Sequence, residues 1–394
     1  MNVLLVNSLY YPNVIGGAER STQILAEGLA AAGIRTTVVC TSDKNAINTV
    51  NGLTVHYLKV PNLYWVKDAR SAPALLKPIW HALDTDNPFT PSRLEPVLKV
   101  EKPDIVHTAN LSGFSPALWK AAKTADIPIV HTIRDMYLGC VRSAMFRNGK
   151  GCVSQCPSCK LYSVVRKRLS GLVTGVTGVS EYVLRWHLEH GYFEKAAVKQ
   201  CIYNPVVTNG HGPSDRPKDG HLTFGFVGEI SPHKGVELLL RAFRSLKHEN
   251  ARLKIYGRPF DDTYEKRLRD KYNDPRIEFA GFAKPKEIFA SIDLNVLPSL
   301  CHEAFPRAVV EGYSYGVPAI VSSQGGIPEA VLENETGTVF DPGRPGDLSE
   351  RMIRYLDHPE LVGQMRSNCI QRAQKYAAEK IVRQYIDVYE RVLK

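Results

Sequence analysis

Short apolar runs alternate with longer amphipathic stretches along most of the chain, and this alternation limits the fold more than any other feature. The runs are apolar on both faces, which is typical of parallel strands covered by helices on either side. The predicted strands are 3–8, 36–41, 104–108, 127–133 and 173–179 in a first series and 222–227, 253–256, 277–279, 294–297 and 319–322 in a second. Because helices intervene each time, we expect an α/β protein with two Rossmann-like, doubly wound parallel sheets.

A segment rich in Gly, Pro, Asn and Asp separates the two series, and this composition sustains neither helix nor strand. We therefore predict a first domain over 1–204, a linker over 205–220 and a second domain over 221–377. A final helix at about 378–394 is expected to pack back on the first domain. Because open α/β sheets bind ligands at the carboxyl ends of their strands, we expect a ligand cleft between the two domains.

Positive charge is concentrated in the first half of the chain. The 394 residues carry a net charge of +10, and residues 1–204, with 23 basic and 14 acidic side chains, account for +9 of it. Between Asp135 and Glu181 there is no acidic residue. The basic residues of that stretch are Arg142, Arg147, Lys150, Lys160, Arg166, Lys167 and Arg168. This distribution favours an anionic partner, which could be a membrane surface, a phosphate-bearing substrate or a nucleic acid.

The composition is that of a soluble globular protein, with 44% hydrophobic residues and no apolar run near the roughly 18 residues that a membrane span needs. The first residues lack a basic flank and a long apolar core, so they predict a strand and not a signal peptide. We therefore expect a cytoplasmic protein with reduced cysteines, one that could lie on the inner face of the plasma membrane.

The segment 297–321 has the strongest chemical pattern: a strand, a polar loop, a helix that opens at Pro306, and a new strand. Free amides at the helix start and the helix dipole would form an anion site. The residues at this start are Phe305, Pro306, Arg307 and Ala308. Glu311 would then reach a ribose, and Glu303 would face the group that the phosphate carries. The alternative is structural: Glu303 complements the dipole, and Glu311 pairs with Arg307 four residues earlier.

Two further turns could approach a phosphate. Gly228 and Lys234 stand between a predicted strand and a helix, where lysine acts as a point-charge ligand. Gly16 and Gly17 follow the first strand and would allow a ligand close to the backbone. Taken alone, the lysine could equally be a solvated surface residue, and a bare Gly-Gly pair is a weak signal.

Four cysteines are clustered in the basic stretch. They are Cys140, Cys152, Cys156 and Cys159. Four thiols that include one Cys-x-x-Cys pair suit a tetrahedral structural zinc. Free thiols and disulfides are the alternatives, because the spacing is irregular and no second Cys-x-x-Cys pair is present.

The order of these motifs resembles the family-4 retaining glycosyltransferases of GT-B fold over nearly the whole chain. The matching motifs are Gly16-Gly-Ala-Glu19, Gly178-Val-Ser180, Asn204-Pro, the Val227-Gly turn with Lys234-Gly, Glu303 with Glu311, and Ser322-Ser-x-Gly325-Gly-Ile-Pro-Glu329. The Glu303 and Glu311 pair is the most specific of them. Only the stretch from about 43 to 91 matches nothing in the family pattern.

The resemblance implies a role for each matching position. Lys234 and the amides after Glu303 would hold the diphosphate of a nucleotide-sugar donor, Glu311 would bind its ribose, and Glu303 would contact the transferred sugar. Gly16 and Gly17 would close over the donor phosphates and the acceptor. The resemblance implies no catalytic metal, because lysine and the helix start would neutralise the leaving diphosphate.

Two positions depart from the family pattern. Many relatives carry an arginine at the position of Glu229, so Lys234 would carry more of the diphosphate or Arg258 would substitute. The family usually has a histidine where this chain has Arg134. Here Arg134 and Asp135 would act together on the acceptor side. His131 lies three residues earlier on a strand, so its side chain is expected in the core.

The resemblance thus implies a retaining, metal-independent hexosyltransferase that moves a sugar from a nucleoside diphosphate, most simply UDP, to a glycan or lipid-linked acceptor in polysaccharide synthesis. Two alternatives are a GT-B sugar-nucleotide epimerase, which would need no second substrate, and a non-catalytic basic GT-B-like scaffold. The scaffold would explain why Glu229 and Arg134 replace the usual arginine and histidine. Nucleic-acid binding is disfavoured because the acid-free stretch offers only Tyr137 and Phe146 as stacking residues before Cys152.

Overall fold

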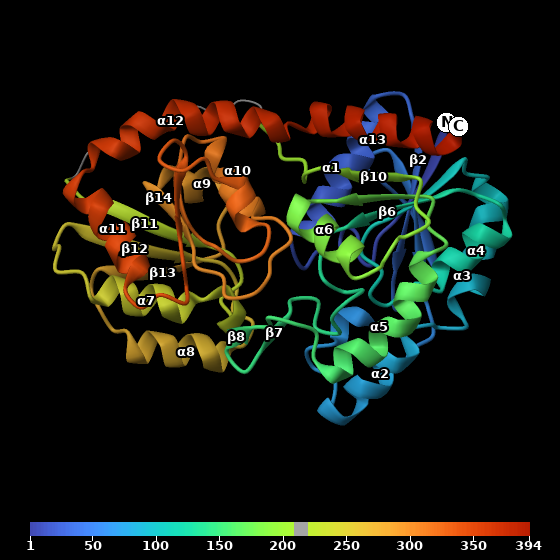
Figure 1. The fold of residues 1–394 in the computed structure, drawn as a ribbon, viewed down its shortest axis with the longest axis horizontal. Coiled ribbons are helices and arrows are strands. Elements are labelled where there is room, and N and C mark those ends of the chain that lie inside the picture. The colour runs from blue at the N-terminus through green and yellow to red at the C-terminus, as the bar shows by residue number, and fades with distance from the viewer. Residues whose placement is uncertain (209–219) are drawn as a thin grey trace. The chain divides into compact units, whose positions relative to one another are not determined.

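The computed structural model describes residues 1–208 and 220–394, so most of the predicted linker lies outside the described residues. The chain divides into two compact units (Figure 1). The first comprises Met1–Met145, Val153–Pro205 and Ala378–Lys394, and the second comprises Phe146–Cys152 and Val206–Ala377. The short segment Phe146–Cys152, which the sequence analysis placed within the first domain, therefore belongs to the second unit.

The first unit is built on an eight-stranded sheet in the order β10-β9-β6-β5-β1-β2-β4-β3. Neighbouring strands are parallel, except that β3 pairs with β4 antiparallel. The strands are β1 (Asn2–Val6), β2 (Arg35–Thr41), β3 (Ala46–Val50), β4 (Leu53–Leu58), β5 (Ile105–Thr108), β6 (Ile129–Ile133), β9 (Gly175–Gly178) and β10 (Val198–Cys201). The helices are α1 (Gly17–Ala31), α2 (Lys77–Leu83), α3 (Thr90–Glu101), α4 (Leu118–Thr124), α5 (Pro157–Ser170), α6 (Glu181–Glu189) and α13 (Ala378–Leu393).

The edge strand β3 and its neighbour β4 lie in a stretch for which the sequence analysis predicted no element. Their turn is Asn51-Gly52, with φ of 48° and 80°. Two consecutive left-handed residues form the tight hairpin turn that Asn-Gly favours, so this dipeptide was the missed signal.

The second unit contains a fully parallel six-stranded sheet in the order β13-β12-β11-β14-β15-β16. Its strands are β11 (Leu222–Val227), β12 (Ala251–Tyr256), β13 (Ile277–Gly281), β14 (Leu294–Leu297), β15 (Ala319–Ser322) and β16 (Gly337–Phe340). Its helices are α7 (Val236–Arg244), α8 (Asp262–Lys271), α9 (Pro285–Ala290), α10 (Arg307–Tyr313), α11 (Asp347–Asp357) and α12 (Glu360–Ala373). A separate hairpin consists of β7 (Phe146–Arg147) and β8 (Lys150–Gly151). The prediction of two parallel α/β sheets is confirmed.

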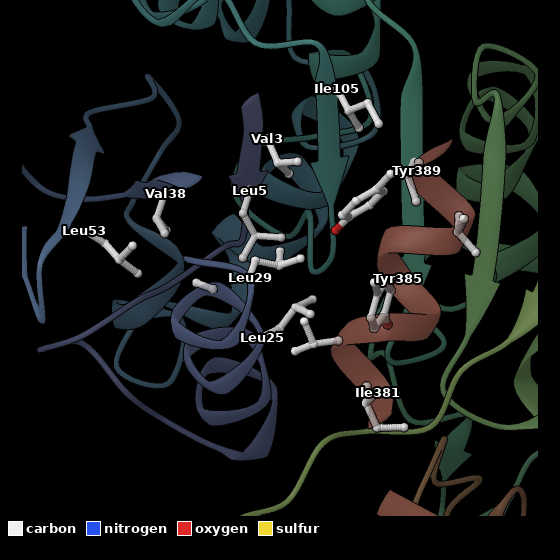
Figure 2. Packing of buried hydrophobic residues seen from close by; sticks show 14 of the residues in the cluster. Val3, Leu5, Leu25, Leu29, Val38, Leu53, Ile105, Ile381, Tyr385 and Tyr389 are labelled. Atoms are coloured by element: carbon white, nitrogen blue, oxygen red, sulfur yellow. The ribbon is translucent and has the colours of Figure 1, made fainter. Parts of the chain in front are cut away.

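The last helix, α13, completes the core of the first unit. Its buried side chains Ile381, Tyr385 and Tyr389 pack toward residues of β1 and α1 such as Leu5 and Leu25 (Figure 2). α13 and α1 approach so closely that a Cβ on Gly28 of α1 would lie 2.6 Å from Cγ2 of Val382. The hydroxyl of Tyr389 also hydrogen-bonds Nδ1 of buried His107 at 2.7 Å.

None of the helices in the described ranges is long and apolar enough to cross a membrane. The longest of the helices that flank the first sheet, α13, alternates buried and exposed positions along its length. Such a helix is amphipathic and packs one face on a protein core.

Replacing Tyr389 with alanine should lower the free energy of unfolding of the first unit by about 3–5 kcal/mol, as is usual for truncation of a buried aromatic. The change also removes the partner of the His107 ring. The measurement is urea unfolding, with Glu390→Ala as the control because Glu390 is exposed on the same helix. Equal midpoints for the two variants would contradict this account of α13.

Candidate functional site

Three loops of the second unit meet because of the order of its strands. The strands β11, β14 and β15 are adjacent and parallel, so the loops that follow them leave from the same edge of the sheet. These loops span 228–235, 298–306 and 323–327. The carboxyl edge of an open α/β sheet is where such proteins bind ligands.

Lys234 and Glu303 form an ion pair at this edge, with 2.9 Å between Nζ and Oε1. Lys234 ends the 3-10 turn η3 (Pro232–Lys234) after β11. Glu303 lies in the loop after β14, and its Oε1 also accepts a hydrogen bond from the Ser299 hydroxyl. Burial alone would lower the pKa of Lys234, but Glu303, with smaller contributions from Cys301 and Glu229, raises it above the ordinary value. The lysine is therefore charged at neutral pH.

Two glycines allow the three loops to come together. Gly235 has a φ of 71°, and a Cβ there would lie 1.9 Å from the carbonyl oxygen of Pro298. Gly325 has a φ of 63°, and a Cβ there would lie 2.4 Å from the carbonyl oxygen of Glu303. The same carbonyl accepts a hydrogen bond from the amide of Gly326 at 2.8 Å. Only glycine fits these left-handed, crowded positions, so both residues hold Lys234 and Glu303 in place.

Glu311 is engaged in a second ion pair. The guanidinium of Arg307 binds Oε1 of Glu311 through Nη2 at 2.9 Å and Nε at 3.0 Å. This is the intrahelical pairing that the sequence analysis weighed as the structural alternative. A ribose would have to compete with Arg307 for this carboxylate, so the ribose role of Glu311 stays a prediction.

The predicted anion site at the start of α10 stays a prediction, and the structure limits which amides could take part. α10 begins at Arg307, with Pro306 as its N-cap, and has seven residues. The amide of Arg307 donates to the carbonyl of Phe305 at 3.1 Å, and Pro306 has no amide hydrogen. The Phe305 side chain is buried near Tyr376, and the Ala308 carbonyl accepts from Asn295. Two of the four predicted positions, Pro306 and Arg307, therefore offer no free amide to a phosphate.

The remaining residues of the predicted donor site have other contacts. The amide of Gly228 donates to the Tyr256 carbonyl at 3.0 Å. Arg258 is exposed, and its guanidinium lies 4.7 Å from the ring centre of Phe282. Glu229, at the departure from the family pattern, lies 3.8 Å from Nε2 of His233. The structure thus gives Arg258 a stacking contact and does not favour it as the substitute phosphate ligand.

The first unit has its own cluster at the carboxyl ends of β1 and β6. Gly16 is the N-cap of α1, and its amide donates to Oε2 of Glu19 at 2.8 Å, with Gly17 as the first residue of the helix. Burial raises the pKa of Glu19, and the Gly16 amide and the charge of Arg134 oppose this shift. Arg134 also donates from Nη1 to Oδ1 of Asn204. The two glycines, Glu19 and Arg134 are therefore neighbours in one unit.

Asp135 is the acidic member of this region. Its Oδ1 accepts a hydrogen bond from the amide of Tyr137 at 2.8 Å. Burial raises the pKa of Asp135 to about 6, against the opposing influence of that amide and of Arg166. A carboxyl group with such a pKa can exchange a proton near neutral pH.

The expectation that His131 is a core residue is confirmed. Its side chain is buried, Nδ1 hydrogen-bonds the Thr108 hydroxyl at 2.8 Å, and the ring stacks on Phe193. Burial lowers its pKa to about 3, so the imidazole is neutral.

The four cysteines do not form the predicted zinc site. Cys140, Cys156 and Cys159 belong to the first unit. Burial raises the pKa of the Cys159 thiol to about 12, and the neighbouring thiols of Cys140 and Cys156 raise it further in the same direction. Cys152 belongs to the hairpin of the second unit. Across residues 1–208 and 220–394, no group of three or more His, Cys, Asp or Glu side chains is placed to hold a metal ion.

The basic stretch contains a buried network that the sequence analysis missed. Arg166 is only 1% exposed, its Nη1 donates to the Tyr137 carbonyl at 2.5 Å, and its guanidinium lies 4.0 Å from the Tyr137 ring centre. The Tyr137 hydroxyl donates in turn to Oδ2 of fully buried Asp84 at 2.6 Å. Arg166 therefore cannot contribute to a basic surface. Helical spacing was the available signal, because Arg166 lies three residues from buried Ser163 and Leu169.

Comparisons with known proteins cover both units. Residues 15–209 match the family described as Glycosyltransferase Family 4, and residues 213–376 match the family described as Glycosyl transferases group 1. One relative, from Klebsiella pneumoniae, is described as an uncharacterized 42.6 kDa protein in the cps region. It is 34% identical over 331 residues, which are 84% of this chain and 87% of that protein.

Solved structures share the architecture. The sucrose-phosphate synthase of Thermosynechococcus elongatus superposes with a TM-score of 0.80 at 20% identity, over 99% of this chain and 98% of that one. HepE of Anabaena, solved in complex with UDP, gives a TM-score of 0.74 at 17% identity, over 99% of this chain and all 100% of that one. At these identities the likeness shows the fold, two Rossmann-like parallel-sheet domains of the GT-B type. The chain therefore belongs to the family-4, group 1 glycosyltransferases.

Proposed function

We propose that the protein is a retaining glycosyltransferase that moves a hexose from a nucleoside diphosphate sugar to a glycan or lipid-linked acceptor. The donor that we propose is a UDP-sugar. The observation that carries this proposal is the Lys234–Glu303 ion pair at the carboxyl edge of the second sheet. Two comparisons support it. HepE has been solved with UDP-glucose, and the relative in Klebsiella is described from a cps region.

In this proposal Lys234 neutralises charge on the leaving diphosphate. The bond between the sugar C1 and the diphosphate oxygen breaks, the acceptor oxygen bonds to C1, and negative charge develops on the diphosphate. A lysine already fixed in position stabilises that charge without reorganising. Its present partner, Glu303, would turn to the transferred sugar, and Glu311 would exchange Arg307 for the ribose hydroxyls.

The acceptor side is proposed to lie in the first unit, at Gly16, Gly17, Glu19, Arg134 and Asp135. The acceptor hydroxyl must lose a proton as it attacks. The raised pKa of Asp135, about 6, suits it to take part in that transfer near neutral pH. Arg134, held by Asn204, would orient an anionic acceptor or the sugar.

The surface of α2 and α5 is proposed to contact an anionic membrane. These helices touch through the Tyr162 hydroxyl, which donates to the Pro78 carbonyl at 3.2 Å (Figure 1). Apolar side chains are unusually exposed here, among them Ile79 of α2 at 57%, and Leu161 at 72% and Val164 at 65% on α5. Exposed Lys160, Lys167 and Arg168 stand on α5, which has no acidic residue. Apolar and basic side chains together fit the interface of an anionic bilayer.

Lys234→Ala should weaken binding of UDP by about 1.5–3 kcal/mol, the range for a hydrogen bond to a charged group, and should leave uridine nearly unaffected. Glu311→Ala should weaken UDP and uridine alike, because both contain the ribose. Titration calorimetry is the measurement. Lys271→Ala and Glu265→Ala are matched controls, because each also breaks a surface ion pair in the second unit. Equal losses of UDP and uridine with Lys234→Ala would refute its assignment to phosphate.

Transfer should continue in excess EDTA, because protein cations provide the charge stabilisation. The measurement is release of UDP from UDP-sugar in the presence of acceptor, before and after chelation. Loss of activity that magnesium or manganese restores would refute metal independence. Turnover of the donor to an epimer without any acceptor would instead favour the epimerase.

The membrane proposal predicts co-sedimentation with vesicles that increases with anionic lipid content and decreases with salt. Each basic residue near the surface contributes about 1 kcal/mol. The triple variant Lys160→Ser, Lys167→Ser and Arg168→Ser should bind less at low salt, and Leu161→Ser with Val164→Ser should bind less at every salt concentration. The control is Arg142→Ser, outside α2 and α5. If the fraction of protein that co-sediments with vesicles does not depend on lipid charge, salt or these residues, the membrane proposal is refuted.

A further inference from the structure

Three cysteines of the first unit meet at the start of α5. Cys156 is the N-cap of this helix, and Cys159 lies in its first turn. The thiols of Cys156 and Cys140 both hydrogen-bond the Cys159 thiol. All three are free thiols in the structure. They therefore form one reduced cluster of thiols in contact, which the proposed donor and acceptor sites do not use.

The helix start places Cys156 and Cys159 within reach of a disulfide bond. The amide of Lys160 donates to the Cys156 carbonyl at 2.9 Å, so the first turn of α5 closes at Cys156. In such a turn, Cα atoms three residues apart lie about 5 Å from each other. A disulfide spans about 4.4–6.8 Å between Cα atoms. Pro157 suits the first helical position, where its missing amide hydrogen costs no helix bond.

The two thiols differ in exposure and in their surroundings. Cys156 is partly exposed, whereas Cys159 is buried, and burial raises the pKa of Cys159 to about 12. The Cys156 sulfur lies 3.2 Å from the Ser158 hydroxyl. A negative charge on this sulfur would be stabilised by the α5 dipole and by exposed Lys160 one turn along the helix. Cys156 is therefore suited to react first with a disulfide from solution, and Cys159 is suited to resolve the product.

Cys159 also contacts the loop that carries Asp135. Its sulfur hydrogen-bonds the backbone of Val141 as well as the Cys140 thiol. In the same loop, the amide of Tyr137 donates to Oδ1 of Asp135. A new covalent partner on the Cys159 sulfur would change its bonds to Cys140 and Val141. Oxidation of Cys159 would therefore alter how α5 supports this loop.

We propose that Cys156 and Cys159 are a redox modification site, at which a low-molecular-mass disulfide oxidises the pair to a reversible disulfide bond. The Cys156 thiol loses its proton to solvent, its sulfur attacks one sulfur of the oxidant, and the S–S bond of the oxidant breaks to release a thiolate. Cys159 gives its proton to that thiolate. The Cys159 sulfur then attacks the Cys156 sulfur and displaces the second thiolate, which takes a proton from solvent. Two protein thiols are oxidised, and one external disulfide is reduced to two thiols.

The test treats the full-length chain with oxidised glutathione and then alkylates the thiols that remain free. Reduction and a second alkylation with an isotopically distinct reagent mark the cysteines that were oxidised, and fragmentation of peptides 135–142 and 151–160 locates each label. The second label is expected on Cys156 and Cys159, and dithiothreitol added before the first alkylation should remove it from both. A second label on neither residue, on Cys156 alone, or on Cys140 with Cys159 would overturn the proposed pair.

Cys156→Ser should slow oxidation of Cys159 at least about tenfold, because the buried thiol then lacks the partner that reacts first. The matched control is Cys201→Ser, which removes another partly exposed thiol of the first unit and should leave the oxidation rate unchanged. Oxidation of Cys159 at equal rates in the two variants would overturn the role of Cys156.

Hydrogen exchange tests the link to the loop. Amides within 136–143 should exchange at different rates in the oxidised and reduced wild-type chain, and the oxidant should have no such effect on Cys156→Ser. Equal exchange in the two states of the wild-type chain would overturn the link. These measurements need no nucleotide or acceptor, so their outcome is independent of the proposed transferase activity.

Discussion

The adjacency of β11, β14 and β15 in one parallel sheet is the constraint on which the candidate site depends. It brings the loops that carry Lys234 and Glu303 to the same edge, although the two residues are far apart in the chain. The loops can then approach only where a side chain is missing, at Gly235 and Gly325. The ion pair is therefore a consequence of strand order and of two glycines.

The alternation of strands and helices could be predicted from the sequence because buried parallel strands appear in it as continuous apolar runs. That Lys234 and Glu303 lie at the same site could be predicted only from the family resemblance, because no local sequence pattern shows that residues of different loops lie together. Local rules failed where tertiary contacts decide. Arg166 was counted as surface charge but is buried under Tyr137, and Cys152 was grouped with the other cysteines although the hairpin attaches it to the second unit.

Charge pairing within the second unit has a thermodynamic consequence for binding. Lys234 and Arg307 each have a carboxylate partner, so an anion gains their attraction only as it replaces or shares those partners. Partly buried pairs of this kind cost desolvation, and breaking one side leaves an uncompensated charge. In the proposed function, a ligand that carries both a diphosphate and hydroxyl groups would satisfy both members of each pair. This favours a nucleotide sugar over a simple phosphate at the same edge.

Hydrogen exchange of the full-length chain, with and without saturating UDP, tests the central claim most directly. The account predicts slower exchange of backbone amides in the loop 228–235 and in 298–311, which comprises the loop after β14 and the first residues of α10 and so includes both ion pairs. Amides inside β12 should not change, because they lie in the sheet and away from the ligand edge. Saturated binding without protection of either loop, or with protection confined to the first unit, would contradict a donor site at the carboxyl edge of the second sheet.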